Sequence, residues 1–293
     1  MKTYKTIDLF AGVGGIRLGF ERAGFKTVFA NDFDRTCKQT YDLNFDNPKL
    51  NNDDINEINI SSLPEFDILL GGFPCQAFSI AGRREGFKDK NGRGHLFFKL
   101  AEIISKRKPQ AILLENVKNL KSHDNGRTFA VIKKTLENLG YNIKTEVLNS
   151  MTHGNIPQNR ERIFIAGFLD EQMAQAFEFP NQIPLTKNFR EFVKNEADDK
   201  YYYNNKPLYT RIKNDINSEY SVYQWRRKYV RTNKHGVVPT LTANMGLGGH
   251  NVPIIKNHKG IRKLTPKECF MLQGFPETFK IPNIADSKLY HQA

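Results

Sequence analysis

A cysteine in a glycine-rich loop has the surroundings that best suit a nucleophile in this chain. Cys75 lies in the segment GGFPCQAFS at positions 71–79, directly after the apolar run at positions 67–70. An apolar run closed by two glycines is typical of a buried parallel strand that ends in a loop, where open α/β sheets carry their chemistry. Proline fixes its own φ and glycine admits a close ligand, so Pro74 and Gly72 would hold the thiol in one direction. The competing interpretation is a buried cysteine that acts as a small apolar side chain.

A carboxylate and two guanidiniums have positions that suit the same chemistry. Glu115 comes directly after the buried run AILL at positions 111–114, so we expect it at the same sheet edge as Cys75. A carboxylate there is more typical of catalysis than of structure. Arg160 and Arg162 are two residues apart, and on an extended segment they share a face that suits a phosphate or carboxylate clamp. A solvated charged loop is the alternative for this arginine pair.

A glycine turn near the start of the chain is a candidate cofactor site. A strand predicted at 4–9 ends in the segment FAGVGG at 10–15, and a helix is predicted at 16–23 with Gly24 as a left-handed cap. Strand, glycine turn and helix place backbone N–H groups at a helix N-terminus near a ligand. The match to GxGxxG fails because Arg17 occupies the third glycine position. The turn is compatible with a nucleoside cofactor or with a purely structural role.

Acidic and aromatic residues follow the second predicted strand, at 26–30. Asp32 is placed to accept hydrogen bonds from ribose hydroxyls, and Phe33 could stack on an adenine. For Asp34 the simpler interpretation is favourable negative charge in the first turn of the next helix. Asp54 lies in a polar stretch with the composition of a surface loop and is a candidate contact to the base.

Alternating strands and helices must position these residues. The order of elements predicts an α/β fold with a doubly wound, mostly parallel sheet. The predicted strands are at 4–9, 26–30, 67–70, 111–114, 142–148 and 162–168, and the predicted helices are at 16–23, 95–106 and 128–139. Between them, the glycine-rich basic stretch at 80–94 favours a closing lid over disorder.

The character of the chain changes near Pro180, where the alternation stops. Positions 200–234 hold nine Lys or Arg residues against Asp215 and Glu219, interleaved with tyrosines and Trp225. Basic residues that contact phosphates and aromatics that stack favour a nucleic-acid surface, and the aromatics argue for a packed small domain rather than disorder. A helix opens at Thr265-Pro266-Lys267-Glu268 with the pattern of a capping box.

Composition limits the classes of protein. The chain has 293 residues, a formal net charge of +13 and three cysteines, and a pI near 9.5. The charge favours a polyanionic partner. The cysteines are far apart, so neither a disulfide framework nor a zinc site is expected, and a reducing cytoplasm is the expected location. No apolar run approaches membrane-spanning length, and we expect neither a membrane nor a metal as a partner.

Five ordered blocks resemble the bacterial DNA (cytosine-5)-methyltransferases of restriction–modification systems. The blocks are DLFAGxGG at 8–15, GFPCQ at 72–76, ENV at 115–117, QxRxR at 158–162, and RxLTPxE at 262–268 with LQGFP at 272–276. The resemblance implies an S-adenosyl-L-methionine-dependent methyltransferase fold with a catalytic and cofactor-binding domain at 1–179. It also implies a smaller target-recognition domain at 180–260 and a return segment at 261–293 that packs toward the catalytic domain.

The resemblance also implies roles for individual residues and double-stranded DNA as substrate. Cys75 would be the nucleophile, with Glu115 and Arg162 at the cytosine and Arg160 in support. The residues implied at S-adenosyl-L-methionine are Phe10, Ala11, Gly12, Gly14, Gly15, Asp32, Phe33, Asp54, Ile55 and Pro74. A thiolate that adds to C6 makes C5 nucleophilic, and the cytosine must leave the duplex to be reached.

Three alternatives remain open at this point. The family pattern ends with a Gly-Asn-Ser-Val block, whereas this chain stops at His291-Gln292-Ala293. We therefore expect either a truncated form or a split subunit whose C-terminal segment is a separate chain. A DNA-binding remnant without turnover and an RNA cytosine-5 methyltransferase of the same fold are the other two. The side chains that reach base edges can be located only from a fold.

Overall fold

The structure, a computed structural model, describes residues 2–74, 95–233, 235–247 and 252–293. It divides into two compact units, which we call the first unit and the second unit. The first unit comprises residues 1–148 and 162–179, and the second comprises residues 149–161 and 180–293.

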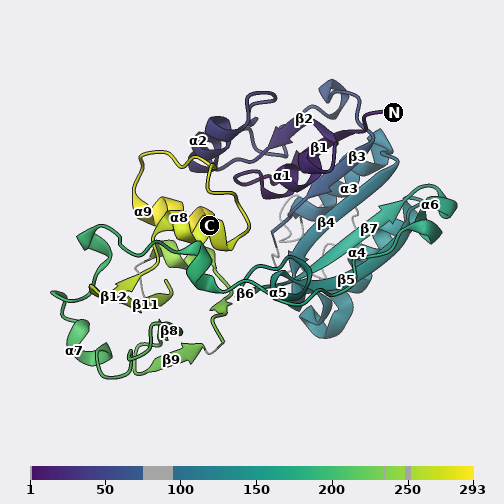
Figure 1. The fold of residues 1–293 in the computed structure, drawn as a ribbon. Helices are drawn as coiled ribbons and strands as arrows, with labels where there is room; N and C mark the ends of the chain where they lie inside the picture. Colours follow the sequence, from purple (N-terminus) through teal and green to yellow (C-terminus); the bar gives the residue numbers. More distant parts are fainter. Residues whose placement is uncertain (1, 75–94, 234, 248–251) are drawn as a thin grey trace. The chain divides into compact units, whose positions relative to one another are not determined.

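A six-stranded sheet forms the first unit (Figure 1). Its strands lie in the order β2-β1-β3-β4-β7-β5. Pairs β1–β2, β1–β3 and β3–β4 are parallel, whereas β7 runs antiparallel to β4. This confirms the expected mostly parallel α/β sheet. The strands are β1 (Lys5–Leu9), β2 (Lys26–Asn31), β3 (Ile68–Gly71), β4 (Ala111–Val117), β5 (Asn142–Asn149) and β7 (Glu161–Phe168).

Helices of the first unit pack their apolar positions against the sheet. In α4, Ile132 and Leu136 lie four residues apart and are fully buried, as one face of an amphipathic helix requires. They join one core cluster with sheet residues such as Ile112 and Ile163. The helices are α1 (Gly15–Arg22), α2 (Arg35–Asn44), α3 (His95–Arg107), α4 (Arg127–Asn138) and α6 (Glu171–Ala176), with 3-10 turns at Ile60–Ser62, Lys118–Lys121 and His123–Gly126.

Strand direction brings several loops to one edge of this sheet. Because β1, β3 and β4 are parallel, the segments that follow Leu9 and Gly71 emerge beside the last residues of β4. Since β7 is antiparallel to β4, its beginning lies at the same edge, where Arg162 pairs with Val117. The topology therefore gathers residues that are far apart in sequence.

An antiparallel four-stranded sheet in the order β12-β11-β8-β9 dominates the second unit. Its strands are β8 (Val222–Trp225), β9 (Val230–Asn233), β11 (Ile254–Asn257) and β12 (Gly260–Lys263). A short parallel pair, β6 (Gln158–Asn159) and β10 (Val238–Pro239), is separate from it. The helices are α5 (Ser150–His153), α7 (Tyr209–Ile212), α8 (Pro266–Leu272) and α9 (Asp286–Gln292), with 3-10 turns at Phe189–Phe192, Asp199–Tyr201 and Ala243–Leu247.

Most aromatics of the basic region form the core of the second unit. Tyr203, Tyr223 and Trp225 pack with Ile212 and Ile254 in one cluster. Of the large apolar residues at 200–234 that the structure describes, only Tyr220 and Tyr229 are exposed. The expectation that these aromatics stack on nucleic acid is therefore wrong for most of them. These aromatics pack in a core cluster instead.

A buried ion pair connects β12 to α8. The Arg262 guanidinium donates two bonds of 2.8 Å to the Glu268 carboxylate, and both side chains are almost fully buried. Glu268 also accepts from the backbone N–H of Thr265 at 2.8 Å, and the Thr265 hydroxyl accepts from the Glu268 N–H at 3.2 Å. The predicted capping box is confirmed.

The compact units differ in extent from the ranges expected from the sequence. The expected boundary between residues 179 and 180 coincides with a unit boundary. Residues 149–161 and 261–293, however, group with the second unit. The roles assigned to those ranges stay predictions. No helix of the described residues is long and apolar enough to span a bilayer.

Candidate active site

The glycine turn between β1 and α1 has a backbone that requires glycine. Gly12 and Gly14 have φ of +54° and +88°, and Gly14 is the N-cap of α1. A Cβ at Gly14 would lie 2.3 Å from Cε2 of Phe45, so a side chain there would clash as well as strain the backbone. The backbone N–H of Ala11 donates to the carbonyl of Asn31 at 3.0 Å, which ties the turn to the end of β2. The helix α1 begins at Gly15, one residue earlier than predicted, and Gly24 follows its end with φ of +89° as expected.

Asp32 connects the glycine turn to the segment after β2. Its Oδ2 accepts from the Gly12 N–H and its Oδ1 from the Asp34 N–H, both at 2.9 Å. Burial raises the pKa of Asp32, against the opposing effect of these two backbone donors. Beside it, 74% of the Phe33 surface is exposed, which leaves the ring free to stack on a ligand. Asp34 caps α2 by accepting from Thr36 and Cys37, which confirms its helix-terminal interpretation.

The segment with Asp54 and Ile55 lies next to the end of β2. Asn31 forms a parallel bridge with Asn51, and Asn52 donates to the Asp32 carbonyl at 2.7 Å. Asp54 is exposed, and its carboxylate accepts from Asn56. The Ile55 side chain is buried in the core. Sequence reasoning missed the asparagines, which give no signal until the strands are paired.

Glu115 and Arg162 form an ion pair at the edge where the loops converge. Arg162 Nε lies 2.9 Å from Glu115 Oε1, and the side chains are 16% and 23% exposed. Burial lowers the pKa of the Arg162 guanidinium, and the neighbouring Glu115 carboxylate opposes that effect. A Cβ built on Gly72 would lie 3.6 Å from Glu115 Oε2 and 3.9 Å from the Phe10 carbonyl oxygen. The glycine turn, the loop after β3 and the acid of β4 therefore meet at one place.

Asn116 fixes the loop that leads to Cys75. Its side-chain amide donates to the Phe73 carbonyl at 2.8 Å in a buried environment. The Phe73 ring is buried against Phe97, with the ring centroids 5.5 Å apart. The backbone just before the exposed Pro74 is thus held from two sides. The sequence pattern marked Asn116 as part of a block but did not indicate this contact.

Two predicted features lie outside the described residues, namely Cys75 and the lid at 80–94. The other two cysteines, Cys37 and Cys269, are buried and unpaired. Burial raises the pKa of both thiols, which makes them poor sources of thiolate.

The second predicted arginine belongs to the second unit. Arg160 donates from Nη1 to the Leu241 carbonyl at 3.2 Å. The first unit thus brings together Glu115, Arg162, Gly72 and Phe10, and separately joins Gly12 to Asp32. Within the residues described, no group of three or more His, Cys, Asp or Glu is arranged to hold a metal ion.

Comparison with solved structures gives the class of the fold. The chain resembles the Dnmt2 methyltransferase of S. pombe with a TM-score of 0.73 and 18% identity, over 99% of this chain and 93% of that one. It also resembles a putative DNA modification methyltransferase of E. coli with a TM-score of 0.60 and 20% identity, over 99% of this chain and 97% of that one. The fold is therefore that of the methyltransferases.

Sequence comparison then gives the family. Residues 4–293 match the C-5 cytosine-specific DNA methylases. The chain is 53% identical to the type II methyltransferase M.Bsp6I of Bacillus sp. (strain RFL6), over 98% of this chain and 92% of that one. It is 36% identical to M.HhaI of Haemophilus parahaemolyticus, over 98% of this chain and 88% of that one. The chain belongs to the C-5 cytosine-specific DNA methylase family and is a DNA cytosine-5 methyltransferase, which confirms the resemblance stated from the sequence.

Proposed function

We propose that the protein transfers a methyl group from S-adenosyl-L-methionine to C5 of a flipped-out cytosine in double-stranded DNA. The transfer proceeds through a covalent bond between Cys75 and C6. The protein then serves as the modification enzyme of a restriction–modification system. The observation that carries the proposal is the Glu115–Arg162 pair at the edge reached by the loop to Cys75. The type II names of the relatives support the restriction–modification setting.

The first unit has groups that fit S-adenosyl-L-methionine. Around Gly12, a Cβ would meet no atom within 4 Å, so a ligand can approach the backbone of the turn. Each Asp32 oxygen accepts one backbone bond and keeps a lone pair for a ribose hydroxyl. The exposed Phe33 ring suits the adenine face. When bound, the cofactor supplies an electrophilic methyl group.

The residues at the sheet edge would act on the pyrimidine. The Cys75 thiolate would add to C6, so that the C5–C6 π electrons form a C4–C5 double bond and the C4–N3 π electrons move onto N3, where Glu115 shares a proton. Arg162 holds Glu115 in place and stabilises the negative charge that develops on the ring. C5 then takes the methyl group, a base removes the C5 proton, and the C5–C6 double bond re-forms as the thiolate leaves. Neither buried cysteine can replace Cys75.

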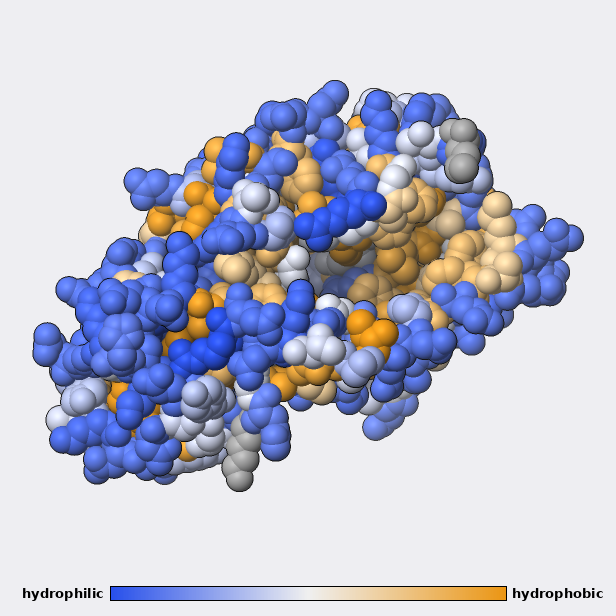
Figure 2. All heavy atoms as spheres, viewed as in Figure 1, coloured by the Kyte–Doolittle hydropathy of each residue, from blue (hydrophilic) through white to orange (hydrophobic). Residues whose placement is uncertain are grey.

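The second unit would supply most of the contacts to DNA. It holds 20 of the 44 Lys and Arg residues but only 10 of the 31 Asp and Glu residues, so it carries +10 of the net charge of +13. On the face drawn in Figure 2, hydrophilic residues cover most of this unit. Such a surface favours a polyanion that is bound through its phosphates. A separate C-terminal segment stays a prediction.

Transfer of labelled methyl groups to duplex DNA and to transfer RNA tests the proposal. Cys75→Ala should abolish labelling of DNA and retain DNA binding, whereas Cys37→Ala, a matched change at a buried thiol, should retain activity. DNA with 5-fluorocytosine should trap the wild-type protein covalently. The catalytic base that removes the C5 proton from cytosine cannot remove fluorine from C5, so the bond to Cys75 persists. Labelling by Cys75→Ala would rule out the covalent route. Labelling of transfer RNA in preference to DNA would favour the RNA alternative.

A further inference from the structure

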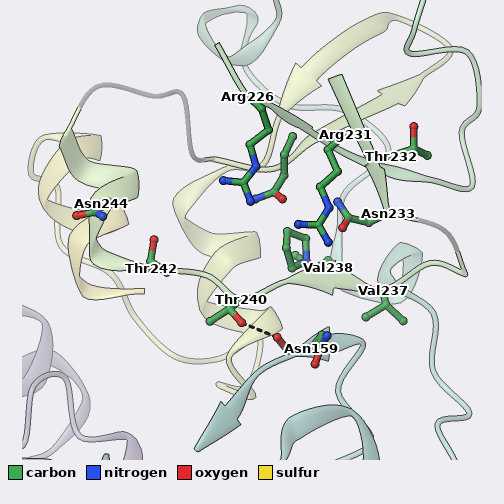
Figure 3. Close-up of a pocket in the computed structure, with 12 residues that line it drawn as sticks. Asn159, Arg226, Arg231, Thr232, Asn233, Val237, Val238, Thr240, Thr242 and Asn244 are labelled. Carbon is green, nitrogen blue, oxygen red and sulfur yellow. Dashed lines mark hydrogen bonds between the residues drawn. The ribbon is translucent and has the colours of Figure 1, made fainter. Parts of the chain in front are cut away.

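The second unit contains a polar cavity that the catalytic residues do not explain (Figure 3). Its volume is about 660 Å³. Among the residues that the structure describes, no acidic side chain lines it. The lining residues are Asn159, Gln224, Arg226, Arg231, Thr232, Asn233, Val237, Val238, Pro239, Thr240, Thr242 and Asn244.

The β8–β9 hairpin brings two arginines to this cavity. Gln224 pairs directly with Arg231 across the hairpin, and Arg226 follows Gln224 by two residues, so all three share one face. The other face carries Tyr223 and Trp225 into the core of the unit. Figure 3 shows Arg226 and Arg231 extending side by side toward Val238. The hairpin therefore presents both exposed arginines on the face opposite its packed side.

Gln224 presents a buried acceptor that has no donor. The residue is only 7% exposed, and its Oε1 has no hydrogen-bond partner among the described residues. A buried polar atom left unpaired is costly, so a ligand that donates to Oε1 gains that energy on binding. The Gln224 side chain thus adds an unsatisfied neutral acceptor, buried at the cavity wall, to the two cationic donors.

The opposite wall of the cavity is anchored to residues 158–160. The Thr240 hydroxyl donates to the Asn159 carbonyl at 2.6 Å, and the Leu241 N–H donates to Gln158 Oε1 at 3.1 Å. The Gln158 amide in turn donates to the Leu272 carbonyl at 2.7 Å. A wall held by this many bonds keeps its shape when a ligand enters.

A G·C pair fits these groups better than a phosphate does. In the major groove, guanine presents O6 and N7 as acceptors, and its cytosine partner presents the N4 amino group as a donor. A phosphate is an acceptor only and would leave Gln224 Oε1 unpaired. The combination of two arginines and one free acceptor matches the pattern of the base pair.

We propose that this cavity reads a G·C pair of the recognition sequence, with Arg226 and Arg231 donating to guanine O6 and N7 and Gln224 Oε1 accepting from cytosine N4. The assignment rests on the proposed function, since it takes double-stranded DNA as the substrate. It makes these three residues determinants of sequence specificity rather than of catalysis.

Selection of bound duplexes from a randomised DNA library tests the assignment without requiring methyl transfer. The full chain should enrich a guanine at a fixed position, and Arg231→Ala or Arg226→Ala should weaken that preference by about 5- to 150-fold. Arg231→Lys keeps the charge but cannot form a bidentate hydrogen bond, so it should also relax the preference for guanine. Arg211→Ala, an exposed arginine of the same unit outside the cavity, should leave it unchanged.

Two outcomes would overturn the assignment. In the first, Arg226→Ala and Arg231→Ala weaken DNA binding equally on all sequences and retain the base preference, which is the behaviour of phosphate contacts. The other is an unchanged guanine preference in Arg231→Lys. Gln224→Leu should also weaken the preference for the G·C pair, and thermal unfolding shows whether that variant is folded. Absent methyl transfer with intact sequence selection would refute the proposed function and leave the readout standing.

Discussion

Asp8 is a fully buried carboxylate in β1, next to the glycine turn. Neither of its oxygens accepts a hydrogen bond of ordinary geometry from the described residues. Burial raises its pKa from 3.8 to about 7, against smaller opposing effects of the backbone N–H and guanidinium of Arg17. The folded state therefore binds this proton more tightly than the unfolded chain does.

The sign of the pH dependence follows from this difference. Between pH 3.8 and about 7 the folded state binds more protons than the unfolded state, so the contribution of Asp8 to stability falls as pH rises and is constant above that range. At about 1.4 kcal/mol per pKa unit, the loss is at most about 4 kcal/mol. Asp8→Asn should remove this decline. Urea unfolding of both proteins at pH 5 and pH 8 measures it, and an equal decline in the variant would contradict the assignment to Asp8.

The Glu115–Arg162 pair should matter for the chemical step rather than for cofactor binding. Glu115→Gln keeps the size of the side chain but cannot supply a proton to N3, so single-turnover methyl transfer should slow by about 10²- to 10⁴-fold. The dissociation constant for S-adenosyl-L-methionine, measured by calorimetry, should stay unchanged. Glu102→Gln is the matched control, because Glu102 pairs with Lys99 and Lys106 in α3. A full rate in Glu115→Gln would remove the residue from the mechanism.

At the residue scale, the sequence indicates the acids and glycines better than the amides. Glu115 follows a clear apolar run, so its position at the sheet edge could be predicted. Asn116 contacts the carbonyl of Phe73, which is 43 residues away, and Asn52 contacts the carbonyl of Asp32. These bonds depend on strand register, which one sequence does not specify. The role of Cys75 as the nucleophile stays a prediction.

At the scale of elements, the turn between β1 and α1 can be compared with the end of α1. Gly14 and Gly24 have nearly equal φ, +88° and +89°, but only Gly14 has Phe45 and Tyr41 where its Cβ would lie. Gly24→Ala should therefore cost only backbone strain, about 1–2 kcal/mol. Gly14→Ala should cost about 1–3 kcal/mol more because it overpacks the site.

Urea unfolding of the two glycine variants separates strain from packing. Gly14→Ala should also weaken the binding of S-adenosyl-L-methionine, because it displaces the turn that carries Gly12. Gly24→Ala should leave that binding unchanged. Equal losses of stability in the two variants would mean that Phe45 and Tyr41 move aside at no cost.

Periodicity predicts long elements well and short ones poorly. The expected helices at 95–106 and 128–139 are observed as His95–Arg107 and Arg127–Asn138, because a 3.6-residue repeat over three turns is a strong signal. The strands of the second unit were not predicted. Each of its four sheet strands has four residues, and in β8 the buried Gln224 breaks the apolar pattern.

At the scale of the whole molecule, charge and aromatic content have different meanings. The net charge of the second unit could be read from the sequence and supports a polyanionic partner. Most aromatic residues of the same region fill its core instead of its surface, because a unit with short strands needs large side chains to bury enough apolar area. Composition therefore predicted a polyanionic partner. The residues proposed to recognise it could be identified only from the fold.

The charge of the second unit leads to a prediction about salt. Lysines and arginines that neutralise phosphates release counterions, so the logarithm of the DNA-binding constant should fall linearly with the logarithm of salt concentration. For about six to ten phosphate contacts, the constant should fall by about 10³- to 10⁵-fold between about 50 and 200 mM salt.

Fluorescence anisotropy with a labelled duplex measures the slope, and S-adenosyl-L-methionine binding to the same protein is the internal control, since it should change little. Lys228→Gln, at an exposed lysine in the turn between β8 and β9, should make the slope shallower by about 1 on every sequence tested. Arg231→Lys keeps its charge, so it should leave the slope unchanged while it relaxes base preference. A flat dependence on salt would mean that the positive charge of this unit does not meet the DNA backbone.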